Sequence, residues 1–254
     1  MPVPPLPNAF LIRPIAHRAL HDGNRTRAEN GRLAVEAAIA RGYGIEIDVQ
    51  PSADGDAMVF HDYDLGRVTT ATGAIRQRSA DALANVSYRT GEVGIPTLAQ
   101  ICDQIAGRVP LLIEIKDQDG MMGSDIGTLG SSVAKVLRDY EGPLAVMSFN
   151  PHAVAEMRDL LPDVPRGLTT SDFPKKDWLL LSDARRAELA SLDKVEAVGA
   201  SFISHKITAL DHPPVLALKE RGIPVLCWTV KSAAQEIKAR KVAQNITFEG
   251  YLPA

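Results

Sequence analysis

The chain alternates short runs rich in β-branched residues with longer stretches whose apolar side chains recur at helical spacing. Residues 29–41 show the helical pattern, with Leu33 and Ala37 on one face and Gly42 where a helix end is expected. Residues 44–50 (GIEIDVQ) alternate apolar and polar side chains, as a strand does. Strands separated by helices favour βαβ units and a parallel sheet.

The same pattern continues to the end of the chain and predicts about eight strand–helix repeats. The expected strands are 12–17, 44–50, 110–116, 144–149, 166–169, 200–204, 224–230 and 245–248, with a further extended segment at 57–61. The expected helices are 29–41, 96–106, 125–140, 151–160, 182–193, 213–221 and 233–240. Eight repeats close an α/β (β/α)₈ TIM barrel, which typically takes about 250 residues. An open doubly wound sheet is the structural alternative, but no GxGxxG turn follows the first strand.

A polar stretch at 64–94 interrupts this rhythm and shows no strong periodicity. It contains TTATG and SYRTGEVG, which are typical of loops. We therefore expect one TIM-barrel domain over residues 1–254, with a small loop-rich insertion after the second strand region. Loops of this length in compact domains are usually functional or mobile.

Composition adds little that is specific. The chain has a formal net charge of -3, 45% hydrophobic and 23% charged residues, as in an ordinary globular protein. No basic excess indicates a nucleic-acid partner. Cys102 and Cys227 lie in apolar contexts and are expected to be buried, reduced thiols. No signal peptide and no membrane-length apolar run are recognisable, so we expect a cytoplasmic location without stable membrane insertion. The oligomeric state stays open.

Barrel enzymes carry their chemistry at the carboxyl ends of the strands. Glu46 and Asp48 are two apart on one expected strand, so both side chains point to the same side. Glu114 and Lys116 repeat this arrangement. Three carboxylates on adjacent strands form an oxygen cage suited to Mg²⁺ or Ca²⁺. The alternative is an ion network made by the protein alone, in which Lys116 pairs with Glu46 or Asp48.

Two histidines also fall at the ends of extended segments. His17 is followed by Arg18, and His61 is followed by Asp62, which either orients His61 or caps the next turn. Two imidazoles near three carboxylates indicate paired acid–base work. The guanidinium of Arg18 matches the oxygens of a phosphate. A cation, an arginine and two imidazoles together are the equipment of phosphoryl chemistry.

Other polar residues at strand ends are weaker candidates. His21 and Asp22 follow the first strand in a loop, where solvated side chains are the simpler interpretation. His205 and Lys206 end a later strand and would lie on the catalytic face if the strand count holds.

An ordered set of motifs resembles the signature of the glycerophosphodiester phosphodiesterases, and it spans nearly the whole chain. The motifs are His17-Arg18, Glu29-Asn30, Glu46-Ile47-Asp48-Val49, Asp54-Gly55, His61-Asp62, Pro96-Thr97-Leu98, Glu114-Ile115-Lys116, Ser148-Phe149 and Trp228-Thr229-Val230. That family is a TIM barrel with a small insertion after the second strand region. The resemblance implies metal-dependent hydrolysis of a small glycerophosphodiester to glycerol 3-phosphate and an alcohol, in lipid and glycerol metabolism.

The resemblance also implies roles for individual residues. These are one divalent cation, Mg²⁺ or Ca²⁺, on Glu46, Asp48 and Glu114; an acid–base pair, His17 and His61; and substrate contacts through Arg18, Lys116 and Trp228. Either histidine can be the base, and either water or the substrate's own 2-hydroxyl can attack.

This chain departs from the family pattern in three places. Ala19 stands where Gly often follows the His-Arg pair, which is tolerable if the backbone keeps a negative φ. Ala28 replaces the Pro that commonly precedes Glu-Asn, and the chain end ITFEGYLP replaces the frequent Thr-Asp-x-Pro. These changes leave the metal and histidine positions intact and affect the shape of the substrate pocket.

Three other functions are compatible with parts of the pattern. A phospholipase D-like enzyme acting on lysophospholipids would share the whole site, although the weak apolar exposure expected from the sequence favours soluble substrates. A non-catalytic module that binds phosphorylated polyols would normally have lost a ligand or a histidine. A sugar-phosphate isomerase or aldolase would leave both histidines without a role.

Overall fold

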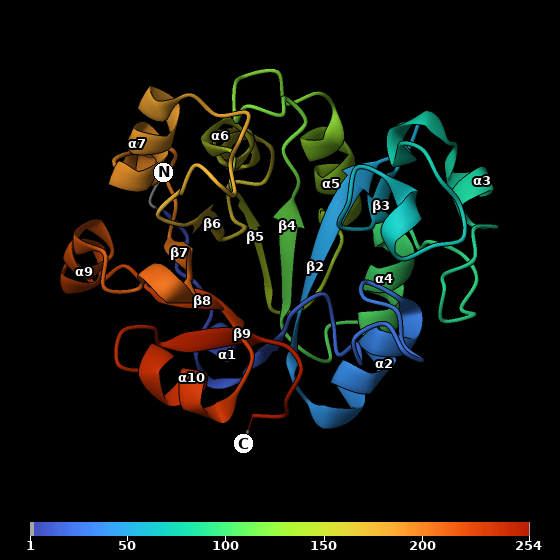
Figure 1. Cartoon of the computed structure of the whole chain (residues 1–254), viewed down its shortest axis with the longest axis horizontal. Coiled ribbons are helices and arrows are strands. Elements are labelled where there is room, and N and C mark those ends of the chain that lie inside the picture. Colours follow the sequence, from blue (N-terminus) through green and yellow to red (C-terminus); the bar gives the residue numbers. More distant parts are fainter. Residues whose placement is uncertain (1–2, 254) are drawn as a thin grey trace.

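Eight parallel strands close into a barrel in this computed structural model, which describes residues 3–253 (Figure 1). They are β1 (Ile15–Ala16), β2 (Gly44–Pro51), β4 (Leu111–Ile115), β5 (Leu144–Ser148), β6 (Arg166–Thr170), β7 (Phe202–Lys206), β8 (Val225–Val230) and β9 (Asn245–Phe248). The barrel closes because β1 pairs in parallel with both β2 and β9. The TIM-barrel prediction is confirmed, and closure rules out the open doubly wound sheet.

Helices connect the strands, and all seven predicted helices are present with slightly different ends. They are α2 (Arg32–Arg41), α4 (Leu98–Ile105), α5 (Leu129–Leu137), α6 (Pro151–Leu160), α7 (Asp183–Ser191), α9 (Pro213–Glu220) and α10 (Ala233–Ala239). Local chemistry fixes several of their starts. Thr97 and Gln100 form a reciprocal capping box at α4, and the Asn150 side chain accepts the His152 N–H at α6.

The first expected strand is wrong in its starting residue. Ile12 ends a four-residue helix, α1 (Ala9–Ile12), and β1 begins only at Ile15. Pro14 lies between the two elements and favours an extended residue before it. A single helical turn shows no 3.6-residue repeat, so the pattern missed α1 and likewise α8 (Lys194–Ala197).

Side-chain alternation on β2 separates the core from the site. Ile45, Ile47 and Val49 are buried in the large cluster between the strands and the surrounding helices, whereas Glu46 and Asp48 point into the barrel. The barrel interior below the pocket is filled by a separate apolar cluster. Its buried members are Leu6, Phe10, Ile15, Leu112, Ala145, Met147, Phe202 and Leu226. Gly167 makes room in this layer, because a Cβ there would collide with the Phe202 ring.

The polar excursion follows β3 (Ala57–Val59), which pairs antiparallel with the end of β2. It forms the 3₁₀ turns η1 (Leu65–Arg67) and η2 (Ile75–Gln77) and the short helix α3 (Ala80–Leu83), and lies beside β2 in Figure 1. A small core of its own, which includes the fully buried Tyr88, holds it together. Treating 64–94 as an insertion within one domain stays our proposal, and the expected limits Met1 and Ala254 lie outside the described residues.

The structure also bears on two simpler expectations. Cys102 and Cys227 are buried and free of disulfides, as predicted. Across residues 3–253, no helix combines the length and apolarity that crossing a membrane requires.

Candidate active site

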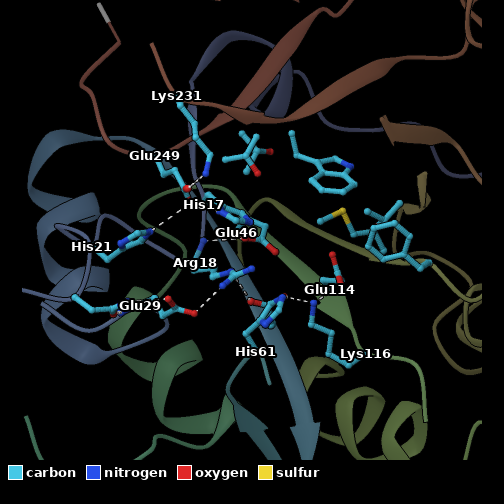
Figure 2. Close-up of a pocket in the computed structure, with 18 of the residues that line it drawn as sticks. His17, Arg18, His21, Glu29, Glu46, His61, Glu114, Lys116, Lys231 and Glu249 are labelled. Atoms are coloured by element: carbon cyan, nitrogen blue, oxygen red, sulfur yellow. Dashed lines mark hydrogen bonds and ion pairs between the residues drawn. The ribbon is translucent and has the colours of Figure 1, made fainter. Parts of the chain in front are cut away.

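A polar pocket of about 420 Å³ opens at the carboxyl ends of the barrel strands (Figure 2). Every residue that the family resemblance assigns to the site lines this pocket. They are His17, Arg18, Glu46, Asp48, His61, Glu114, Lys116 and Trp228. The strands β1, β2, β4 and β8, with the segment after β3, deliver them from positions that are far apart in the sequence.

Three buried carboxylates meet at the centre of the pocket. The β2–β4 register places Asp48 directly opposite Glu114, and Glu46 precedes Asp48 by two residues on the same face. One oxygen from each of Glu46, Asp48 and Glu114 lies within 4.8 Å of the others. Burial, together with the charges of Asp48 and Glu114, raises the pKa of Glu46 well above its ordinary value. This concentration of negative charge needs a compensating cation.

Lys116 supplies part of that compensation. Its Nζ lies 2.7 Å from Asp48 Oδ1 and 2.5 Å from Glu114 Oε1. Although burial opposes it, the charge of Lys116 helps to hold the pKa of Asp48 well below its usual range. Lys116 therefore forms the pair with Asp48 that the ion-network alternative requires. Within the described chain, however, no cationic side chain lies within 4.0 Å of a Glu46 oxygen, so one lysine does not neutralise the cluster.

The donor set fits one divalent cation. Three carboxylates offer only hard oxygen ligands, which Mg²⁺ and Ca²⁺ prefer. The ligand residues are also oriented by neighbours: the Asn30 side-chain amide donates to Asp48 Oδ2 at 2.9 Å, and the Arg18 backbone N–H donates to Glu46 Oε2 at 2.8 Å. Such supporting hydrogen bonds are common around metal ligands.

The turn after β1 explains the second of these contacts. Arg18 and Ala19 both adopt left-handed backbone conformations, with φ of 51° and 62°. This conformation directs the Arg18 N–H to the Glu46 side chain and the Ala19 N–H to the Glu46 carbonyl. The condition under which an alanine would be tolerated here, a negative φ, is therefore not met. A left-handed alanine costs roughly 1–2 kcal/mol, so the contacts to Glu46 must offset that strain.

Arg18 also faces the pocket with its side chain. Its Nη1 donates to Glu29 Oε1 at 2.7 Å, and its Nε lies 3.6 Å from Asp48 Oδ2. Nε is buried and has no hydrogen-bond partner in the described structure. A buried cationic donor without a partner is costly, and an oxygen of a bound anion would satisfy it.

His17 is braced by a residue from the far end of the chain. Its Nδ1 donates to Glu249 Oε2 at 2.6 Å, and Glu249 Oε1 accepts from Lys231 Nζ at 2.6 Å (Figure 2). His21 Nε2 lies 3.6 Å from the same carboxylate. Burial lowers the pKa of His17 below its ordinary value even though Glu249 opposes the shift. The neutral ring that donates from Nδ1 keeps a lone pair on Nε2.

His61 is braced by its neighbour in sequence. Its Nδ1 donates to Asp62 Oδ1 at 2.6 Å, and Asp62 Oδ2 accepts from Arg67 Nε at 2.5 Å. Of the two roles considered for Asp62, the structure shows the orienting one. Arg67 then donates to Glu29, which also accepts from Arg18. The polar excursion thus contributes Arg67 to a continuous chain of ion pairs around the pocket.

Sequence reasoning missed several of these residues. His21 lines the pocket, so its interpretation as a solvated loop residue is wrong, whereas Asp22 accepts backbone N–H groups of its own loop. Glu249 directly follows β9, and Lys231 directly follows β8. The rule that strand ends carry the chemistry could have identified both.

His205 and Lys206 do end β7, but neither lines the pocket. His205 is buried against Thr170, and Lys206 pairs with Asp177. Both residues lie on the catalytic side of the barrel, as expected. They do not contact the pocket.

The amino-acid sequence matches the Glycerophosphoryl diester phosphodiesterase family over residues 17–245. The chain belongs to this family. Among its relatives, the glycerophosphodiester phosphodiesterase of Caldanaerobacter subterraneus subsp. tengcongensis is 26% identical over 225 residues, which cover 85% of this chain and 84% of that protein. A Bacillus subtilis (strain 168) protein of the same name is 26% identical over 207 residues, covering 75% and 67%. The enzyme class is that of a phosphoric diester hydrolase.

Solved structures agree with the fold. An Oleispira antarctica phosphodiesterase, solved in complex with the product sn-glycerol-3-phosphate, superposes with a TM-score of 0.76 and 24% identity. The match covers 95% of this chain and 94% of that one. The family match begins at His17 and ends at Asn245, so it contains every nominated site residue and stops short of Glu249.

Proposed function

We propose that this phosphodiesterase is metal-dependent and hydrolyses glycerophosphodiesters to glycerol 3-phosphate and an alcohol, with His17 and His61 as the acid–base pair. One observation carries the proposal. The oxygens of Glu46, Asp48 and Glu114 converge within 4.8 Å of one another in a pocket that both histidines line.

A divalent cation held by Glu46, Asp48 and Glu114 would polarise a phosphoryl oxygen and stabilise negative charge on it. Arg18, with its unpartnered Nε, and Lys116 hold the phosphodiester in place and balance its charge. Mg²⁺ and Ca²⁺ both suit this site. Trp228 and Phe149 line the pocket as an apolar wall and are positioned to contact the alcohol side of the substrate.

The two imidazoles divide the proton transfers. Burial lowers the pKa of His17, so its neutral form dominates at neutral pH, and this supports His17 as the base. His17 takes the proton of the attacking water, or of the substrate's 2-hydroxyl, while a new P–O bond forms. The 2-hydroxyl route gives a cyclic phosphate, which water then opens to glycerol 3-phosphate. His61 delivers a proton to the departing alkoxide as the old P–O bond breaks. Glu249 and Asp62 each accept from Nδ1, which leaves Nε2 of each ring for proton transfer: Nε2 of His17 carries the lone pair, and Nε2 of His61 carries the proton that is delivered.

A non-catalytic module that binds phosphorylated polyols is disfavoured by the same geometry. Such a module has no use for two histidines that are each oriented by a carboxylate at 2.6 Å. A cytoplasmic location stays a prediction from the sequence.

The test is the release of glycerol 3-phosphate from glycerophosphocholine, glycerophosphoethanolamine and glycerophosphoinositol by the purified protein. We expect turnover of at least one of them, loss of activity in EDTA, and recovery on adding Mg²⁺ or Ca²⁺. Full activity in EDTA would support the ion network around Lys116 instead. Absence of turnover with every diester, in the presence of either ion, would sink the proposal.

A further inference from the structure

The connection between β6 and α7 exposes an apolar turn on the catalytic side of the barrel. Two consecutive turns form here: the Asp177 N–H donates to the Pro174 carbonyl, and the Leu181 N–H donates to the Trp178 carbonyl. The tip of the second turn consists of Leu179 and Leu180, whose exposed fractions are 77% and 74%. Turn tips usually carry Gly, Pro, Asn, Asp or Ser, so two leucines there are unusual.

Buried neighbours fix this tip to the rest of the protein. Leu181 packs in a cluster with Met122, Phe173 and Leu189, and Trp178 packs against it. The tip is therefore a fixed projection, and its leucines do not fold back onto the protein. The sequence-based expectation of weak apolar exposure is wrong for this segment.

Aromatic rings connect the tip to the catalytic pocket. The ring centroids of Trp178 and Phe149 lie 5.0 Å apart, and those of Phe149 and Trp228 lie 5.5 Å apart. Phe149 and Trp228 both line the pocket. An apolar path thus runs from the exposed leucines to the pocket wall.

A neighbouring loop carries a further exposed apolar residue. The loop after β4 and the segment before α7 lie together at the top of Figure 1, and Arg185 on α7 donates to the Met122 carbonyl. Met121, next to Met122, is 54% exposed. Exposed apolar side chains are common singly, whereas a group of them marks an interaction site.

Charge beside the leucines indicates the kind of partner. Lys175 and Lys176 form the tip of the first turn and are exposed. The carboxylates of Asp177 and Asp183 are neutralised by Lys206 and Arg186. No ion pair within 4.0 Å links Lys175 or Lys176 to another residue of 3–253. The charges of Lys176 and Lys175 act on Asp177 and Asp183 without forming a close ion pair. Two exposed lysines next to two exposed leucines match the anionic headgroups and apolar interior of a lipid surface.

We propose that the Leu–Lys tip, defined as Lys175, Lys176, Leu179 and Leu180, docks the catalytic face on a lipid surface that contains anionic lipid. The leucines insert at the boundary of the acyl chains, and the lysines lie at the level of the headgroups. The proposal rests on the proposed function only in that the docked face carries the catalytic pocket.

Binding is tested by flotation of the full-length protein with vesicles of phosphatidylcholine alone or with one fifth phosphatidylglycerol. We expect binding to the anionic vesicles. The double variant Leu179→Ser/Leu180→Ser should weaken it by about a hundredfold, since partial burial of each leucine contributes about tenfold. The variant Lys175→Gln/Lys176→Gln should lose the preference for anionic lipid and the dependence on salt. Ile237→Ser, an exposed apolar residue on α10, is the matched control and should bind like the parent.

Activity gives a second readout. The double leucine variant should cleave soluble glycerophosphocholine at the parent rate, because neither leucine lines the pocket. Parent protein that stays off both kinds of vesicle overturns the docking proposal, even if glycerophosphocholine is cleaved. A concentration-dependent dimer that the leucine variant abolishes, without vesicle binding, assigns the tip to a second copy and also overturns it. Vesicle binding without any diester cleavage would leave docking in place and sink the proposed function.

Discussion

The two pocket histidines have the same immediate partner but very different origins. Each ring donates from Nδ1 to a carboxylate at 2.6 Å. The partner of His61 is the next residue, Asp62, whereas the partner of His17 is Glu249, 232 residues away. The His17 side chain is 15% exposed and the His61 side chain is 30% exposed. The His61–Asp62 hydrogen bond is local and partly exposed to water. The His17–Glu249 hydrogen bond exists only because the barrel closes.

The orientation of each histidine therefore depends on a different part of the structure. β9 pairs with β1, and this pairing brings Glu249, just after β9, to His17 at the end of β1. His61 and Asp62 need no such closure, although Arg67 from the excursion fixes their orientation. Damage to the barrel seam should therefore affect His17 first, and damage to the excursion should affect His61 first.

Removing either imidazole gives the largest expected effect. His17→Ala and His61→Ala should each lower kcat by about 10²- to 10⁴-fold, because each loses one proton-transfer step. Steady-state release of glycerol 3-phosphate measures this, with His152→Ala as the control, since His152 is exposed and lies outside the pocket. Near-normal turnover in either pocket variant would show that the rings do not act as a pair.

A third histidine provides a contrast, because it is buried without a hydrogen bond to a carboxylate. His205 is fully buried, and its Nδ1 contacts the Thr170 hydroxyl where the other two rings contact a carboxylate. Burial and the neighbouring His212 lower the pKa of His205 to about 4. Below the ordinary pKa of about 6.5 the unfolded chain binds a proton that folded His205 does not, so stability falls as the pH drops from there to about 4.

The loss due to His205 should reach on the order of 2–3 kcal/mol near the acid end of that window. Urea unfolding at about pH 7 and about pH 4.5 measures it, and His205→Asn should make the free energy of unfolding less dependent on pH. An equal pH dependence in parent and variant would contradict the lowered pKa. Activity at neutral pH should change little, because His205 does not line the pocket.

Replacing the carboxylates that hold the two histidines by neutral amides should give effects of unequal size. Glu249→Gln should lower kcat/KM by roughly 10- to 100-fold, within the range seen when orienting partners are removed. Asp62→Asn should cost less, because water can reach the more exposed His61 and replace part of the lost contact. The pH profile of kcat/KM for each variant separates an altered histidine from altered folding. An Asp62→Asn defect larger than that of Glu249→Gln would reverse the comparison.

The smallest effect on activity is expected at Lys231, which pairs with the carboxylate that holds His17. Lys231 contacts Glu249 at 2.6 Å but is mostly exposed, and exposed ion pairs contribute little. Lys231→Met should therefore change kcat/KM by less than about fivefold. A much larger rise in KM would show that Lys231 contacts the substrate directly.

Much of the barrel and of its acidic centre could be read from local patterns. The alternation in GIEIDVQ placed Glu46 and Asp48 on one face, and the repeat of strands and helices predicted the closed barrel. These patterns have periods of 2 and 3.6 residues, so they are visible over a few neighbours in the chain. The four-residue helices α1 and α8 are too short to show such a period.

The sequence alone therefore determined which strands carry acidic and imidazole side chains, because side-chain direction alternates along a single strand. The folded chain was needed to place Glu249 against His17, Arg67 against Asp62 and the Leu–Lys tip beside the pocket. Those contacts depend on the register of eight strands around a closed barrel and on the packing of loops above it. No local period encodes such distances.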